Sequence, residues 1–554
     1  MVNLMKMSIE NGQKGIRRKG VKALEILWNI LAFTFLFLLL IAFPFYLKDK
    51  YVEMSYYKWI FYVSIMVLLL IAIIPIKVGE FILRSGKRKT IIQDYFVMGY
   101  GILTIITYIN CPNQKAAFMG TDGWYMGAVA QIFFVLSYLI FSRRQVASNA
   151  VIGLNYIGSS FCFIVAVFQR YGKDFLHLYW NMPDEIVRDY LSTIGNRTWF
   201  SAYVCTVFPI GLYLFWKSES REQLIIFGTY TFLAFSCLVT ANSDSAYAGA
   251  FLVLYLLLYL SLGSGKKTER FIDILILWFG ACILMGLLRL PFESKVRDLR
   301  GFSLLFLNLK IAVPCFLLAC LSVPTIRKMD SRINHMNKKF WKRVMLFGPV
   351  ILLFLLVITI CLNTSGILQK YFGITLHNSY LLFNDEWGDD RGSSWKLTVK
   401  MFMDLPIMQQ IFGVGPDCFA YHAYGNLEYS LILRNIWGEA VLANAHNEWL
   451  NSFLCMGLAG GIAYIGIFLS VMIHCLKKAE ADSGNPLVGA IGLCVAGYIA
   501  HNFFCYQQAS ATAVIFVLMG VAMSLSKTGK ADDSVNRPNA LGLWLIQIKK
   551  ERRV

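Results

Sequence analysis

Residues 445–460 read Ala445-His446-Asn447-Glu448-Trp449-Leu450-Asn451-Ser452-Phe453-Leu454-Cys455-Met456-Gly457-Leu458-Ala459-Gly460, and this stretch decides how the rest of the chain is organised. It closes the longest polar region and leads directly into an apolar segment, 461–476. A histidine at the edge of a membrane helix bundle is costly to hold, so it needs a partner or a function. Gly457 and Gly460 allow another backbone to approach closely. If the stretch is helical, His446 shares a face with the apolar Leu450, which is also how a purely structural histidine would lie.

The composition is that of a membrane protein. Of the 554 residues, 57% are hydrophobic, and the mean hydropathy is +0.56, whereas soluble domains are about 45–50% apolar. Apolar runs near the ~20 residues needed to cross a bilayer recur from end to end. We therefore expect an all-α, polytopic integral membrane protein with about 14 transmembrane helices. The expected spans are 23–47, 59–83, 92–110, 123–141, 148–168, 199–216, 223–241, 246–262, 271–290, 303–323, 345–363, 458–476, 486–504 and 507–525.

The net charge of +19 is explained by where Lys and Arg lie, so no nucleic-acid partner is expected. The segment 1–22 is rich in Lys and Arg, and the positive-inside rule places it in the cytoplasm. Alternate loops are then basic as the rule requires, among them 84–89 and 327–343. We expect a multi-pass protein of the cytoplasmic membrane with both termini in the cytoplasm. Its parts would be a cytoplasmic segment 1–22, a membrane domain 23–525 and a basic cytoplasmic tail 526–554.

The 13 cysteines give no sign of a zinc site. Most fall in apolar spans, where they act as small apolar side chains, and no C-x-x-C pair occurs. Cys111 and Cys418 both fall in predicted outer loops. Connectivity cannot be read from sequence, so whether these two pair as a disulfide is left open.

Polar residues gather in three predicted outer loops, 169–197, 289–301 and 363–445. The third is by far the longest, and loops of such length are usually functional or disordered. Its many aromatic residues predict that it is ordered and packs over the bundle. Within it we expect a helix at 396–403, flanked by these stretches: Gly388-Asp389-Asp390-Arg391-Gly392-Ser393-Ser394-Trp395, Leu405-Pro406 and Phe412-Gly413-Val414-Gly415-Pro416-Asp417.

The motifs together resemble the O-antigen ligase and O-antigen polymerase superfamily of bacterial membrane proteins. His446-Asn447 is followed after nine residues by Gly457-x-x-Gly460, which matches the superfamily signature without a gap. The Arg391 and Trp395 pair, a helix, a proline and a Gly-x-Gly-Pro turn before the histidine are also typical of members. The motif-bearing part is expected at about 190–505.

A departure from the family pattern lies upstream, in Asn242-Ser243-Asp244-Ser245-Ala246-Tyr247-Ala248-Gly249. Many members carry Ser-Arg-Gly in this short loop, with the arginine implicated in binding the substrate diphosphate. Here the matching residue is Asp244, so that role does not carry over. Either another arginine, such as Arg197 or Arg300, supplies the charge, or the donor differs. We favour Arg197, which follows the weakly matching Gly195-Asn196.

The resemblance implies a membrane glycosyltransferase. Members transfer or polymerise a glycan from a polyprenyl (undecaprenyl) diphosphate donor onto an acceptor hydroxyl on the outer side of the membrane. The expected partners are a lipid-linked oligosaccharide, membrane lipids and an acceptor that is a glycan, a glycolipid or the cell wall. Ligase and polymerase share the motif, and a protein acceptor also stays open.

Three residues are expected to carry this chemistry. Charge develops on the leaving diphosphate, and guanidinium groups bind it best through paired hydrogen bonds, so Arg391 and Arg197 are the expected diphosphate ligands. A histidine with an ordinary pKa of ~6.5 suits proton removal near neutral pH, so His446 is the expected general base or hydroxyl-orienting group. The alternatives are a salt-bridged loop for Arg391, an interfacial anchor for Arg197 and a structural histidine. No metal and no cofactor is expected.

Four further residues are possible supporting members of the site. Asn447 belongs to the signature, Arg300 lies in the second outer loop, and His501 ends a span on the outer side. Glu439 could orient His446 if the segment between them is helical.

Two other classes of function compete with an enzyme. A polysaccharide flippase or solute transporter would place ionisable residues near the bilayer midplane, but the charges here lie at the ends of spans, with Lys310 as the main exception. A non-catalytic scaffold for envelope assembly would tolerate loss of His446 and Arg391.

Overall fold

The computed structural model describes residues 2–83, 90–293 and 299–526. Within this part the protein is helical, and its strands are the two-residue pair β1 (Tyr190–Leu191) and β2 (Gly195–Asn196), which is antiparallel. The predicted all-α membrane fold is confirmed. The basic loop 84–89 and the tail from 527 onward lie outside the described residues.

In the part of the chain that the structure describes, eleven helical segments are long and apolar enough to cross a membrane. They contain α1 (Val2–Phe37), α3 (Met54–Ile82), α4 (Ile92–Ile109), α7 (Ser148–Arg170), α9 (Arg197–Lys217), α10 (Arg221–Thr240), α11 (Asp244–Ser261), α12 (Gly265–Arg289), α14 (Leu309–Lys328), α16 (Lys338–Thr364) and α22 (Glu448–Glu480). The first continues through the π-helical η1 (Leu38–Ala42) into α2 (Phe43–Phe45), and α12 continues into the 3₁₀-helical η2 (Leu290–Phe292). Three shorter apolar helices are α6 (Ala128–Arg143), α23 (Pro486–His501) and α24 (Ala509–Leu525). Each predicted span overlaps one of these helices.

The helices differ sharply in how much of their surface is buried. The most apolar window of α9 is 89% buried, and α24 is buried along its whole length, so both lie at the centre of the bundle. The corresponding window of α16 is 0% buried. A helix that is apolar all round and uncovered by the protein must face lipid.

Small residues let the central helices α9, α11 and α23 meet closely. A Cβ at Gly249 of α11 would lie 2.6 Å from the Cys205 sulfur and 2.9 Å from the Gly497 carbonyl oxygen. A Cβ at Gly497 of α23 would lie 2.6 Å from the Cys205 carbonyl oxygen of α9. Membrane helices that carry small residues at a crossing can bring their backbones together in this way. The crossing fixes the ends of these three helices relative to one another.

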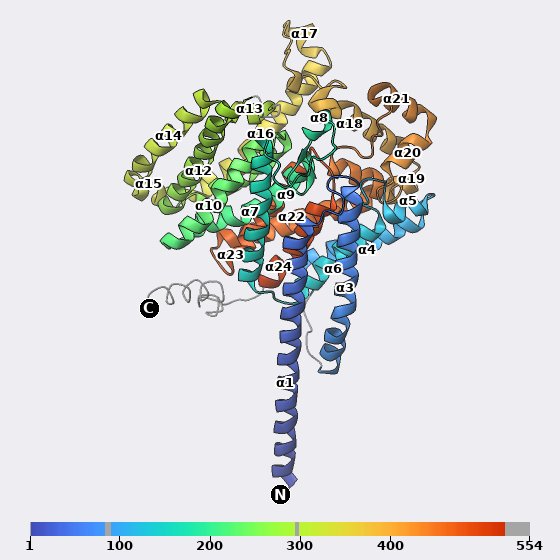
Figure 1. The fold of residues 1–554 in the computed structure, drawn as a ribbon, viewed down its shortest axis with the longest axis vertical. Coiled ribbons are helices and arrows are strands. Elements are labelled where there is room, and N and C mark those ends of the chain that lie inside the picture. The colour runs from blue at the N-terminus through green and yellow to red at the C-terminus, as the bar shows by residue number, and fades with distance from the viewer. Residues whose placement is uncertain (1, 84–89, 294–298, 527–554) are drawn as a thin grey trace.

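The large loop, residues 363–445, is ordered as predicted. It contains α17 (Ile367–Phe372), the 3₁₀-helical η3 (Ser379–Leu381), α18 (Trp387–Asp404), α19 (Ile407–Phe412), α20 (Phe419–Gly425) and α21 (Leu427–Trp437). The remaining short helices are α5 (Gln114–Met119), α8 (Asp184–Val187), α13 (Gly301–Phe306) and α15 (Asp330–His335). In Figure 1 the helices of the large loop lie at the end of the molecule opposite the N-terminus. The predicted helix 396–403 is part of α18.

The turn after α19 packs against the start of α22. Val414 donates its backbone N–H to the Leu454 carbonyl at 3.1 Å, and Gly415 donates to the Cys455 carbonyl at 3.0 Å. Gly457 interrupts α22 with φ 70° and ψ −177°, and a Cβ there would overlap the Ile411 carbonyl. The predicted close approach of another backbone is therefore present at Gly457, and the approaching segment is the end of α19.

Asp417, at the end of this turn, holds a second loop in place. Its Oδ2 accepts the backbone N–H groups of Thr121 at 2.8 Å and Met126 at 3.0 Å. The Thr121 hydroxyl in turn donates to the Asp417 carbonyl at 2.7 Å. Segment 120–127 is thereby fixed against the large loop. Burial of the carboxyl raises the pKa of Asp417 to about 7.

Replacing Gly457 by alanine is expected to destabilise the protein. The backbone conformation at Gly457 is essentially reserved for glycine and costs another residue about 1–3 kcal/mol, and the added methyl would also overlap the Ile411 carbonyl. The melting temperature in detergent should fall. Gly99→Ala in α4 is the control, because its Cβ would meet open space. Equal melting temperatures for the two variants would contradict this account of the kink.

Asp417 should make stability fall as the pH rises. Its pKa is raised from an unfolded value of about 3.9 to about 7, so the folded state holds this proton more tightly. The stabilisation of the folded state by this proton is fully present below about pH 4 and is lost as the pH rises through about 7. Asp417→Asn keeps an acceptor oxygen but does not titrate. We expect its melting temperature to match that of the wild type near pH 4 and exceed it near pH 8.

Asp122→Asn is the matched control for this measurement, since Asp122 is an exposed neighbour. If wild type and Asp417→Asn lose stability equally between the two pH values, then Asp417 does not carry the effect.

Candidate functional site

His446 lies just before α22, in a backbone conformation that the sequence did not predict. Its φ is 48°, in the left-handed region, and its N–H donates to the Asn444 side chain at 3.0 Å. The expectation that His446 shares a helical face with Leu450 is wrong, because α22 begins only at Glu448. The observed role of Asn447 is to cap that helix, with its Oδ1 accepting the Leu450 N–H at 2.9 Å.

The half-buried imidazole of His446 is held between aromatic rings. The Trp437 ring stacks on it with centroids 6.2 Å apart and planes 18° apart. The Tyr506 ring meets it edge-on at 5.3 Å. The Tyr506 hydroxyl accepts the indole N–H of Trp199 at 2.8 Å. Since Trp199 belongs to the first turn of α9, these contacts connect His446 with the helix that begins at Arg197.

Arg391, in α18, lies against the loop 502–508 between α23 and α24. Its Nε donates to the Phe504 carbonyl at 3.2 Å, and its guanidinium also donates to the Gly388 carbonyl. Its positive charge acts on the neighbouring Cys505 and Tyr506 side chains, although burial still raises the pKa of Cys505 to about 11. Arg391 and His446 therefore both lie beside the loop 502–508.

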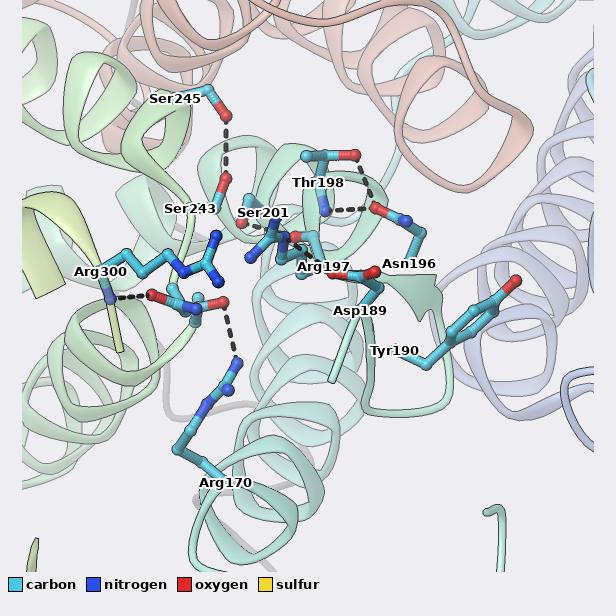
Figure 2. Close-up of polar contacts among 12 residues, drawn as sticks. Arg170, Asp189, Tyr190, Asn196, Arg197, Thr198, Ser201, Ser243, Ser245 and Arg300 are labelled. Carbon is cyan, nitrogen blue, oxygen red and sulfur yellow. Dashed lines mark hydrogen bonds and ion pairs between the residues drawn. The ribbon is translucent and has the colours of Figure 1, made fainter. Parts of the chain in front are cut away.

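Three arginines gather around the turn 240–243 between α10 and α11. Figure 2 shows the side chains of Arg197 and Arg300 extending toward one another, with Arg170 approaching the same turn from the end of α7. Arg197 forms an ion pair with Asp189 at 3.5 Å. The buried Arg170 donates to the Thr240 and Ala241 carbonyls at 2.7 and 3.2 Å. We call Arg170, Arg197 and Arg300 the arginine group.

Asp244, which the resemblance leads us to expect at the position of a family arginine, caps α13. Its Oδ1 accepts the N–H of Phe302 at 3.0 Å. The neighbouring Asn242 side chain accepts the backbone N–H of Arg300 at 2.8 Å. The two residues together hold Arg300, the N-cap of α13, over the turn that lacks the family arginine.

A chain of hydrogen bonds runs from Glu448 to Ser243, in the turn that the arginine group approaches. The buried Glu448 carboxylate accepts from the Asn502 amide, and the Asn502 Oδ1 lies 2.7 Å from Nδ1 of His501. Nε2 of His501 lies 3.1 Å from the Ser245 hydroxyl, which is 2.9 Å from that of Ser243. Figure 2 shows the two serines beside Arg300 and Arg197.

The chemistry of its members fixes the direction of this chain. An amide oxygen can only accept, so Nδ1 of His501 donates to Asn502. Burial disfavours a charged ring, and in the neutral ring Nε2 is then an acceptor for the Ser245 O–H. Both ring nitrogens of His501 are thus engaged by the protein.

Glu448 also borders a pocket beneath the His446 stretch. Its carboxylate accepts the hydroxyls of Tyr464 at 2.5 Å and Tyr498 at 3.0 Å. The pocket is small, with a cavity volume of about 30 Å³. It is lined by carboxylate, amide and aromatic side chains, among them Asp417, Gln507, Trp124, Asn451 and Tyr506. Of the described residues, no three His, Cys, Asp or Glu side chains are grouped so as to hold a metal ion, and metal independence stays a prediction.

The structure brings together five of the seven candidates named from the sequence. Their elements meet around the loop 502–508 and the segment 240–245: His446, Arg391, Arg197, Arg300 and His501. Asn447 serves as a cap. Glu439 could orient His446 only if the segment between them were helical. This segment is not helical, because α21 ends at Trp437, and Glu439 is exposed.

Sequence reasoning missed Arg170, Tyr506, Glu448 and the two serines. The position of Glu448 directly after His446-Asn447 was a usable signal, since an acid entering an apolar helix must be satisfied there. The sequence also carried a signal for Arg170, because this arginine ends an apolar span beside a predicted outer loop. Nothing local marks Tyr506. The two serines lie in the stretch 242–249 that the resemblance singled out, but no role was expected for them.

Residues 311–465 match the family model described as O-Antigen ligase. The matched segment runs from α14 through the large loop into α22, so it contains Arg391, the turn 413–417 and the stretch 445–460. The arginine group lies outside it. No curated protein matches the chain. The resemblance seen in the sequence is confirmed: this multi-pass membrane protein carries an O-antigen ligase domain, which supports a place in the O-antigen ligase and polymerase superfamily and a role as a membrane glycan ligase or polymerase.

Proposed function

We propose that the protein transfers a glycan from a polyprenyl diphosphate donor to an acceptor hydroxyl, on the side of the membrane that carries the large loop, which we take to be the outer side. The observation that carries the proposal is the meeting of His446, Arg391 and the arginine group around one loop and one turn. These residues come from elements far apart in the sequence, and their shared surroundings suit an anion next to a proton acceptor.

The arginine group is suited to hold the donor diphosphate. Guanidinium groups that converge repel one another, and a bound anion relieves that repulsion. Arg170 ends α7, Arg197 begins α9 and Arg300 caps α13. Such positions at the ends of membrane helices match the depth of a lipid headgroup, while the polyprenyl chain would lie in the bilayer. Arg391 would contact the same anion from the large loop.

The transfer needs one bond made and one broken. The acceptor hydroxyl oxygen attacks the anomeric carbon of the donor glycan, and the bond from that carbon to the diphosphate oxygen breaks. The hydroxyl proton passes to His446, and the negative charge passes to the departing lipid diphosphate, where the arginines stabilise it. No covalent enzyme intermediate is needed, because the diphosphate is already a good leaving group.

His446 suits the role of base better than His501. The His501 ring is fully buried and donates to Asn502 while accepting from Ser245. It therefore serves to orient Ser245 and Ser243 beside the arginines. The His446 ring is half-buried and is oriented by Trp437 and Tyr506. Aromatic faces beside it also suit contact with a sugar ring.

The placement of charge favours this reaction over transport. Lys310, which we expected inside a span, is the second residue of α14 and is exposed. It is therefore at a helix end and not at the midplane, where transporters keep their ionisable residues. Ligase and polymerase differ only in the acceptor, and a glycan, a glycolipid, the cell wall or a protein are all compatible with the proposal.

His446→Ala is expected to lower glycan transfer by about 10²–10⁴-fold, as loss of a general base does. Purified protein in detergent with EDTA would be assayed for release of undecaprenyl diphosphate from a lipid-linked oligosaccharide. His377→Ala is the control, since His377 is an exposed histidine of the same loop. Activity that survives EDTA and His377→Ala but not His446→Ala supports the proposal. Unchanged activity of His446→Ala would show that another residue is the general base. Release that requires a metal ion would contradict a metal-independent mechanism.

Removing an arginine is expected to weaken both donor binding and turnover. Arg391→Ala and Arg300→Ala should each lower kcat/KM for the lipid-linked donor by about 10²–10³-fold, the usual loss when one donor to a developing anion is removed. Arg300→Lys should retain part of the kcat/KM that Arg300→Ala loses, because lysine keeps the charge but not the paired hydrogen-bond geometry. Arg434→Ala, at an exposed position of α21, is the control. Variants of Arg391 and Arg300 that both behave like Arg434→Ala would contradict the assignment.

A further inference from the structure

Cys111 and Cys418 bring their sulfurs to 3.8 Å although they lie 307 positions apart in the sequence. Cys111 lies two residues after the end of α4, and Cys418 is the N-cap of α20 in the large loop. Both side chains are buried, with 5% and 2% of their surface exposed. The pair is thus at the junction between a membrane helix and the large loop.

The turn before Cys418 is shaped around the two sulfurs. A Cβ at Gly415 would lie 2.5 Å from the Cys111 sulfur and 2.9 Å from the Cys418 sulfur, and the φ of Gly415 is 128°. Only glycine leaves room there for both sulfur atoms. The Cys111 thiol also donates to the Val414 carbonyl at 3.2 Å. In this chain the Gly-x-Gly-Pro turn 413–416 therefore also makes room for the two cysteine sulfurs.

The environment makes Cys111 the more reactive thiol. The contact with Cys418 lowers the pKa of the Cys111 thiol, whereas the same contact and burial raise the pKa of Cys418. The thiolate is the nucleophile in thiol–disulfide exchange. Cys111 would attack first, and Cys418 would complete the exchange.

We infer that Cys111 and Cys418 form a disulfide that fastens the large loop to the end of α4. The Cys111 thiolate attacks a disulfide of a thiol–disulfide oxidant to give a mixed disulfide, and Cys418 then attacks the Cys111 sulfur. One S–S bond forms within the chain. The two thiols lose two electrons and two protons, and the oxidant leaves as a dithiol. The pairing requires that this side of the membrane be oxidising, as on the outer side proposed above.

The disulfide would restrain the part of the large loop that supports the site. The turn 413–417 is bonded to Leu454 and Cys455 of α22, and Asp417 holds the segment 120–127. A cross-link between residues so far apart in sequence removes much freedom from the unfolded chain. It would therefore stabilise the arrangement on which His446 depends.

Counting thiols in the wild-type protein tests the pairing directly. Membranes from acid-quenched cells would be denatured and labelled with a polyethylene-glycol maleimide, before and after reduction. Of the 13 cysteines, we expect 11 to react before reduction and all of them after it. Labelling of all thirteen before reduction would overturn the inference.

Single variants identify the partners. In Cys111→Ser and in Cys418→Ser, 12 thiols should react both before and after reduction. Cys455→Ser is the control, because Cys455 is a buried neighbour of the same turn, and it should keep the difference of two thiols. If the difference vanishes in Cys455→Ser and persists in Cys418→Ser, the pairing is wrong.

Stability gives a second readout. Dithiothreitol should lower the melting temperature of the wild type by several degrees. The double variant Cys111→Ser, Cys418→Ser should show no response to dithiothreitol. An equal response of the two proteins would contradict a stabilising disulfide between these cysteines.

Discussion

The buried carboxylate of Glu448 is the constraint on which the arrangement of the site depends. A carboxylate away from water must have its oxygens satisfied, and here Tyr464, Tyr498 and Asn502 donate to it. Its backbone N–H also donates to the Asn502 carbonyl at 3.0 Å. These hydrogen bonds therefore fix the start of α22 relative to the end of α23. His446 lies two residues before this junction and His501 immediately beside it, so one buried acid sets the positions of both histidines.

The arginine group imposes a different kind of requirement. Three guanidiniums that approach one turn repel each other, and the fold supplies acceptors that offset this repulsion. Asp189 pairs with Arg197, and the carbonyls that end α10 accept from Arg170. The fold thereby holds three positive charges where α7 ends and where α9 and α13 begin. Such a site attracts anions, and under the function proposed above the anion is the diphosphate of the lipid-linked donor.

The sequence predicted the features that local pattern controls. Apolar runs of membrane length located the spans, the glycine at 457 marked a close backbone approach, and the resemblance singled out His446 and Arg391. It did not predict contacts between distant segments. The Tyr506 side chain meets His446 across 60 positions, and nothing near Tyr506 in the sequence signals that contact. The left-handed backbone of His446 was also not predicted. The apolar pattern of α22 can be continued back to His446, so the sequence does not show that the helix starts only after the Asn447 cap.

We propose that the aspartate at 244 and the arginine at 300 together form one change from the pattern that the resemblance leads us to expect. A carboxylate cannot bind a diphosphate, but Asp244 accepts the N–H of Phe302 and so fixes the first turn of α13. That turn presents Arg300 over the site, as Figure 2 shows. Restoring the family residue with Asp244→Arg would therefore remove a helix cap and add a like charge beside Arg300. By this reasoning the substitution would impair the protein, although it brings the local sequence closer to that of its relatives.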